Sequence, residues 1–186
     1  MKRIFVIGLV LALFGLVAMA GQATAKVEEV QLGPYEISFN LNIIEPYTVE
    51  IEPNPCVAIE DYSGTIVTKC GASINVSNEI VFVGLNYFET GEHMNASRAA
   101  EKERATPIAD EFKAEMYRRP IDGYDGYLVV KSSILRPNLA YHYAYYTPDP
   151  ATLVIIYSSL PWWGGTLNLL KTIHVEKVGS HESDAA

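Results

Sequence analysis

The chain has little of several features that would point to a particular class of protein. Its 186 residues include only two cysteines, too few for a disulfide-rich scaffold or a four-thiolate zinc site. Lysine and arginine number 14 against 22 aspartate and glutamate residues, and the net charge of −8 argues against nucleic acid as a partner, because phosphate binding needs a basic face. Charged residues make up 19% of the chain and hydrophobic residues 49%, a balance that excludes a disordered protein.

Only one long hydrophobic run occurs, at residues 4–20. Lys2 and Arg3 precede it, and the small-residue signal Ala23-x-Ala25 follows it. This layout predicts a secretory signal peptide over residues 1–25, cleaved after Ala25. The alternative is an uncleaved anchor, which would be the protein's only contact with a membrane, although a run of 17 residues is at the short limit for a span.

The rest of the chain contains no second apolar run of that length. We expect residues 26–178 to form a single domain and residues 179–186 to form a flexible tail, in a protein that is secreted or held at the extracytoplasmic cell surface. Eight acidic residues and no lysine or arginine lie between positions 27 and 68. They indicate solvated strand faces or, alternatively, a patch for a cation or a basic partner.

Two early segments alternate apolar and polar residues, at 35–43 and at 47–52, and Glu45-Pro46 separates them. The alternation predicts two half-buried strands, which we expect to pair as a hairpin. A nearly all-apolar run at residues 79–88 predicts a central strand.

A second hairpin is predicted around residues 62–64, a three-residue loop that ends on Gly64. The register that this loop imposes places Cys56 directly opposite Cys70. In an exported protein the pair predicts a disulfide, and the alternative is two free thiols.

Helix signals gather in the middle of the chain. Thr106-Pro107, with Asp110 and Glu111 close behind, predicts a helix over residues 107–119, and a shorter helix is expected at 97–105. A meander of strands follows at residues 127–134, 139–147 and 152–158, then a short helix at 166–172 and a strand at 173–177. The predicted fold class is therefore α+β, a mostly antiparallel sheet of about seven strands with two or three helices packed on one side.

No recognised catalytic motif occurs, so no catalytic residue, metal ligand or cofactor is assigned. His142 lies on a predicted strand and is interpreted as a packed or surface histidine, although a hydrolase site around it is an alternative. His174 and Glu176 share a strand face, but two ligands do not make a metal site.

The aromatic residues are more informative. Tyr141, Tyr143 and Tyr145 alternate along one strand, and Trp162-Trp163 occupies a glycine-flanked loop. Such side chains suit sugar stacking or contact with a protein partner. Alternatively, the tyrosines pack between the sheet and a helix as part of the core, and the tryptophans fill the end of the sheet.

Asn75-Val76-Ser77 and Asn95-Ala96-Ser97 are acceptor sequences for N-glycosylation. They predict glycans at Asn75 and Asn95 on the surface of an exported protein.

The order of elements resembles that of the PsbP-like extracytoplasmic α+β domains, which implies an accessory or binding module rather than an enzyme. The layout features that carry the resemblance are the opening hairpin at 35–51, the helix at 107–119, the strand at 126–134 and the strand, helix and strand of 153–177.

These observations favour a secreted or cell-surface accessory module without catalysis, which binds another envelope protein or an extracellular ligand. The residues expected to make the contact are Tyr141, Tyr143, Tyr145, Trp162 and Trp163. The alternatives are a carbohydrate-binding module that uses the same aromatic residues, and a secreted hydrolase.

Overall fold

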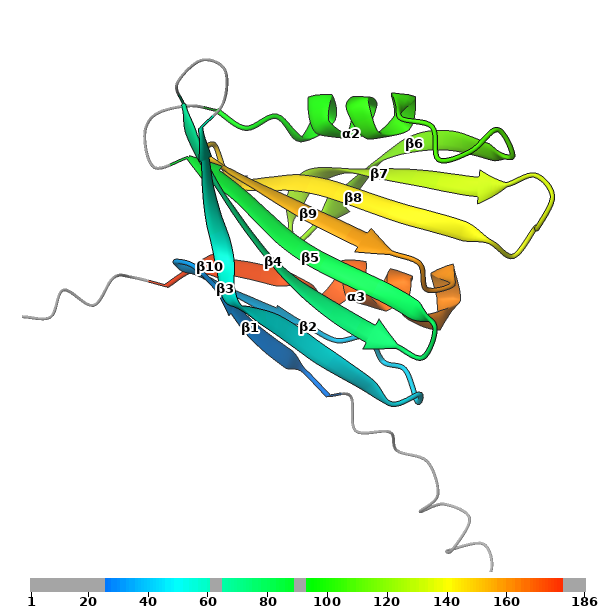
Figure 1. Cartoon of the computed structure of the whole chain (residues 1–186), viewed down its shortest axis with the longest axis horizontal. Coiled ribbons are helices and arrows are strands. Elements are labelled where there is room, and N and C mark those ends of the chain that lie inside the picture. The colour runs from blue at the N-terminus through cyan, green and yellow to red at the C-terminus, as the bar shows by residue number, and fades with distance from the viewer. Residues whose placement is uncertain (1–25, 61–64, 89–92, 179–186) are drawn as a thin grey trace, which may run out of the picture.

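The computed structural model describes residues 26–60, 65–88 and 93–178, which form two antiparallel β-sheets. The predicted signal peptide, the loop at 62–64 and the tail at 179–186 lie outside the described residues. The large sheet has seven strands in the order β3-β4-β5-β9-β8-β7-β6, and the small sheet has three in the order β1-β2-β10 (Figure 1).

The bounds of the elements are as follows. The large sheet consists of β3 (Tyr47–Glu60), β4 (Ile66–Val76), β5 (Glu79–Phe88), β6 (Phe112–Ile121), β7 (Tyr124–Ser133), β8 (Ala140–Asp149) and β9 (Thr152–Ser158). The small sheet consists of β1 (Glu28–Leu32), β2 (Tyr35–Phe39) and β10 (His174–Lys177). The helices are α2 (Ala96–Ala105), α3 (Leu167–Thr172) and a short π-helical turn, η1 (Trp162–Thr166).

The large sheet is the middle layer of the molecule. Helix α2 covers β6, β7 and β8 on one face, and the small sheet and α3 lie against the other face (Figure 1). Because successive side chains of a strand point to opposite faces, neighbouring residues serve different cores. Leu128 packs into the core shared with the small sheet, whereas Val129 packs under α2. We call these two faces the small-sheet face and the helix face.

The structure corrects the predicted fold class, because the described chain is mostly β and its α-helices are α2 and the six-residue α3. The predicted helix at 107–119 is wrong, since most of that segment is strand β6, paired with β7 along its whole length. A spacing of four residues, as between Phe112 and Met116, fits both a helix face and a strand face. Phe112, Ala114 and Met116 are half-buried, and the residues between them are exposed.

Thr106 ends a helix rather than beginning one. Its backbone N–H donates to the carbonyls of Lys102 and Glu103, so it is the C-cap of α2. A proline just after a helix is a common stop signal, because proline cannot continue the helical hydrogen bonds. The expected helix at 97–105 is confirmed as α2, and Thr106-Pro107 marks its end.

The predicted opening hairpin is also wrong, because its two strands belong to different sheets. Strand β2 pairs with β1 and β10, whereas β3 pairs with β4. The turn that joins β1 to β2 contains Gly33, whose φ of +60° favours glycine. A Gly33-Pro34 turn between two alternating segments was the signal for this hairpin.

The later part of the chain follows the prediction closely. The meander β7-β8-β9 is confirmed, as are β5 as an interior strand, helix α3 and strand β10. The described fold lacks two of the features that carried the resemblance to PsbP-like domains, the opening hairpin and the helix at 107–119.

The cysteine hairpin has the predicted register. Cys56 is the partner of Cys70, Ile59 of Val67, and a disulfide joins the two cysteines. A closed loop of this length stabilises the fold by about 3 kcal/mol, because it restricts the unfolded chain. The disulfide is compatible with an extracellular protein.

Candidate functional site

A hollow of about 470 Å³ opens on the small-sheet face of the large sheet. We call it the Trp162 hollow. Its volume lies in the range of small-molecule sites, which typically measure about 300–1,000 Å³. Strands β6, β7 and β8 and the turn η1 supply its lining, which consists of Tyr117, Arg118, Arg119, Pro120, Leu128, Val130, His142 and Trp162.

The loop that carries Trp162 depends on a glycine. Gly165 has a φ of +134°, and a Cβ there would meet the Leu160 side chain at 2.8 Å. In the same turn, the ring centroid of Trp162 lies 5.5 Å from that of His142. Trp163, the next residue, is 84% exposed.

Two polar side chains meet the indole of Trp162 in the hollow. The guanidinium carbon of Arg119 lies 5.1 Å from the ring centroid, within the range of a cation–π interaction. His142 is only 4% exposed, and its Nδ1 atom is buried with no hydrogen-bond partner in the described structure. Such atoms are rare in folded proteins, because an unpaired buried polar group costs free energy.

Burial also lowers the pKa of His142 below its ordinary value, and a hydrogen bond to the backbone of Ser158 opposes this only in part. The imidazole is therefore neutral at pH 7. A neutral ring carries one donor and one acceptor nitrogen. Because the N–H donates to the Ser158 backbone, the unpartnered Nδ1 atom is left as the acceptor.

The described residues do not assemble a hydrolase around His142. Ser158 stands directly opposite it on β9, but its Oγ atom is hydrogen-bonded to Thr166 and accepts from the Leu160 N–H. The lining of the hollow contains no carboxylate to orient the imidazole. A nucleophile and a carboxylate within hydrogen-bond reach are what the hydrolase alternative needs.

The five predicted contact residues are divided between the two faces. Tyr141, Tyr143 and Tyr145 share the helix face, as their alternation predicts, and Tyr145 is buried beneath α2. Trp162 lies in the hollow on the small-sheet face, and Trp163 points to solvent. The structure therefore does not bring the five side chains into one patch.

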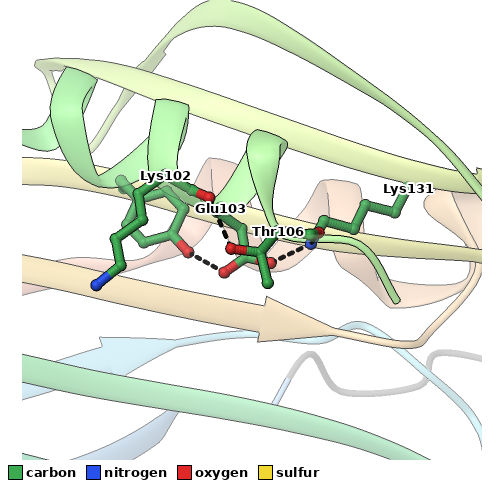
Figure 2. A network of polar contacts seen from close by, with 5 residues as sticks. Lys102, Glu103, Thr106 and Lys131 are labelled. Carbon is green, nitrogen blue, oxygen red and sulfur yellow. Dashed lines mark hydrogen bonds and ion pairs between the residues drawn. The ribbon is translucent and has the colours of Figure 1, made fainter. Parts of the chain in front are cut away.

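A closed polar network that includes Glu103, Thr106 and Lys131 fastens α2 to the sheet (Figure 2), and Tyr145 belongs to it. Lys131 is 1% exposed, pairs with Glu103, and donates from Nζ to the carbonyl of Thr106 at 2.8 Å. The Tyr145 hydroxyl donates to the other Glu103 oxygen at 3.2 Å. Burial, together with the Glu103 charge, raises the pKa of Tyr145. Each polar group in this network has a partner, so we interpret it as structural.

A row of aromatic rings continues along the helix face beside α2. Phe112 stacks on Tyr141 with 5.4 Å between centroids, and Tyr157 lies 6.2 Å from Tyr141 and 5.1 Å from Tyr143. All four are half-buried. We call them the tyrosine row.

His174 and Glu176 do share a strand face, but His174 serves a structural contact. Its Nδ1 atom lies 2.8 Å from Asp122, whose carboxylate also accepts from the Val175 N–H and the Tyr146 hydroxyl. Asp122 sits in the β6–β7 turn and so ties β10 to the large sheet. Within residues 26–60, 65–88 and 93–178, no group of three or more His, Cys, Asp and Glu residues could hold a metal ion.

The predicted glycosylation residues lie at different kinds of position. Asn75 is a half-buried residue of β4. Asn95 is the exposed N-cap of α2, and its Oδ1 atom accepts from the backbone N–H of Arg98 at 2.9 Å. Glycosylation takes place on Nδ2, so the cap and a glycan at Asn95 are compatible. Both sites stay predictions.

Arg119 and Tyr117 were missed by sequence reasoning. The signal for them is the Asp122-Gly123 pair, a strong hairpin turn between two alternating segments. With β6 recognised as a strand, Tyr117 and Arg119 fall on one face together.

No protein-family model, curated protein or solved structure matches this chain. None of the helices in the described residues is long and apolar enough to cross a membrane.

Proposed function

We propose that the protein is an exported, non-catalytic module that binds a ligand in the Trp162 hollow. The observation that carries this proposal is the buried, unpartnered Nδ1 atom of His142 beside an apolar hollow of about 470 Å³. A polar atom in the core without a partner lowers stability. The presence of this unpartnered Nδ1 atom is explained if a bound ligand supplies its hydrogen-bond partner.

Export is part of the proposal. It is supported by the basic, apolar and small-residue segments of residues 1–25 and by the Cys56–Cys70 disulfide. The test is N-terminal sequencing of the protein recovered from outside the producing cell. We expect the sequence to begin at Lys26, and recovery of the protein only from the cytoplasm would contradict this part.

Binding in the hollow can be tested with the neutral fluorescent probe N-phenyl-naphthylamine, whose emission rises in apolar surroundings. We expect the wild-type protein to bind it, and Trp162→Ala to weaken binding by about tenfold, since an indole contributes a large part of the apolar contact. Trp163→Ala is the matched control, because this exposed neighbour does not line the hollow.

The binding part of the proposal is overturned if Trp162→Ala and Trp163→Ala bind the probe alike, or if the wild type does not bind it. If the wild type does bind the probe through Trp162, a competition experiment can link the hollow to a natural ligand. An extract of the producing cell's envelope should displace the probe from the wild-type protein.

The tyrosine row favours a second candidate, a carbohydrate-binding module. Its four half-buried rings provide flat apolar area along the sheet, on which sugar rings can stack. Affinity electrophoresis in gels that contain envelope polysaccharide tests it. Retardation that is lost in Tyr141→Ala and kept in Trp162→Ala would favour the row over the hollow.

A further inference from the structure

Charge singles out one residue in the hollow. The protein is acidic overall, yet the lining of the Trp162 hollow contains Arg118, Arg119 and no carboxylate. Arg118 is exposed and pairs with Asp125 at 2.6 Å. Arg119 makes no ion pair with any described acidic residue, and the contact that positions its guanidinium is the indole of Trp162.

The partial burial of Arg119 makes its lack of an ion pair informative. Of the lysines and arginines in the described ranges, all are exposed except Lys131 and Arg119. Lys131 is paired with Glu103. A cation that is shielded from water normally has a carboxylate partner, because the lost hydration must be replaced. Arg119 is half-buried, and the described chain supplies no carboxylate for it.

We infer that the Trp162 hollow binds an organic anion with a flat apolar body, whose acidic group pairs with Arg119. This inference rests on the proposed function and names its class of ligand. The planar guanidinium donates two parallel hydrogen bonds to a carboxylate or sulfonate. Trp162 and the aliphatic side chains of Leu128 and Val130 contact the apolar body.

The neutral ring of His142 is consistent with this ligand. Burial lowers its pKa, so the ring carries no charge of its own at neutral pH and Arg119 is the cation that selects the anion. Its unpartnered Nδ1 atom is the acceptor nitrogen of the neutral ring and can accept a hydrogen bond from the ligand without a second ion pair.

A matched pair of probes tests the inference on the full exported protein. Anilinonaphthalene sulfonate and N-phenyl-naphthylamine share one aromatic skeleton, and only the first carries an anionic group. We expect Arg119→Gln to weaken binding of the sulfonate by about tenfold and binding of the neutral probe by less than about twofold. Increasing salt should weaken sulfonate binding alone.

Arg98→Gln is the matched control. It removes the same charge from an exposed residue of α2, on the opposite side of the large sheet, so it should change binding of neither probe. Arg119→Lys keeps the charge without the planar fork, and we expect intermediate affinity for the sulfonate. A cooperative urea transition for each variant excludes probe binding to a partly unfolded state.

The outcomes separate the inference from the proposed function. If Arg119→Gln leaves sulfonate binding unchanged while Trp162→Ala binds neither probe, the hollow is a binding site. The inference that Arg119 selects an anionic ligand is then wrong. If Trp162→Ala loses neither probe, the hollow is not a site and both proposals fail. Loss of the sulfonate alone in Arg119→Gln supports both.

Discussion

Two clusters of polar groups lie on opposite faces of the β6-β7-β8 region and differ in whether the described chain supplies their partners. On the helix face, Lys131 pairs with Glu103, which also accepts a hydrogen bond from Tyr145. On the small-sheet face, Arg119 has no carboxylate among the described residues and His142 has an unpartnered Nδ1. Paired groups hold elements together, whereas unpaired groups cost stability and need another reason to be there.

Strand β8 shows the contrast within a few residues. Tyr145 and His142 are both buried, at 6% and 4% exposure, and point to opposite faces. The hydroxyl of Tyr145 donates to a carboxylate, and its ring packs under α2. The ring of His142 lies against Trp162 at the wall of a hollow. Burial alone therefore does not separate a structural residue from a candidate binding residue, but hydrogen-bond partners do.

The largest expected effect is on the helix face. Lys131→Met leaves Glu103 with a half-buried, unpaired charge, and removal of one partner of a buried ion pair costs about 3 kcal/mol. We expect the free energy of unfolding to fall by about this amount in urea denaturation. The double variant with Glu103→Gln should recover much of the loss, and a double variant as unstable as the single one would contradict this reading.

The next effect has the opposite sign, on the small-sheet face. His142→Leu replaces an unpartnered polar ring by an apolar side chain, so the free energy of unfolding should rise by about 1 kcal/mol. The gain should grow as the pH falls below about 6.5, because the unfolded histidine of the wild type binds a proton more readily than the buried one. Urea titrations at pH 5 and pH 8 measure it. A variant less stable than the wild type at both pH values would make His142 a structural residue.

A smaller effect is expected for Arg119. Arg119→Gln should change the free energy of unfolding by no more than about 0.5 kcal/mol, since it removes a cation–π contact at a partly exposed site. Thermal or urea unfolding checks this. A loss comparable to that of Lys131→Met would mean that Arg119 supports the fold.

The smallest effect concerns His174, which is largely exposed. Its hydrogen bond with Asp122 raises its pKa, so the stability that it contributes is fully present below the unfolded value of about 6.5 and is lost as the pH rises through the folded value. His174→Asn should therefore flatten the decline in stability between pH 6 and pH 9. An unchanged pH profile in the variant would show that the contact with Asp122 is energetically neutral.

Local patterns predicted much of the fold. The cysteine register, the β7-β8-β9 meander and the α3-β10 ending follow from loop length, alternation and turn residues. The helix predicted at 107–119 failed because its apolar spacing of four suits both helix and strand, and pairing with β7 decided between them. Pairing between distant segments, as of β2 with β10, leaves no local signal.

The candidate site was predicted only in part. Trp162 was identified by its residue type, and Tyr141 and Tyr143 were correctly placed on one face. Arg119 could not be found while its segment was expected to be helical. The absence of a partner for His142 is a property of packing in three dimensions, and no sequence pattern reports it.

We propose that polar groups of the helix face hold the fold and that those of the Trp162 hollow hold a ligand. The most direct test is urea unfolding of His142→Leu/Arg119→Gln beside Lys131→Met. We expect the double variant of the hollow, His142→Leu/Arg119→Gln, to unfold at the same or a higher urea concentration than the wild type. Lys131→Met should unfold at a lower one. A loss of about 2 kcal/mol or more in the double variant of the hollow would contradict the proposal, because a change of that size marks residues that the fold itself requires.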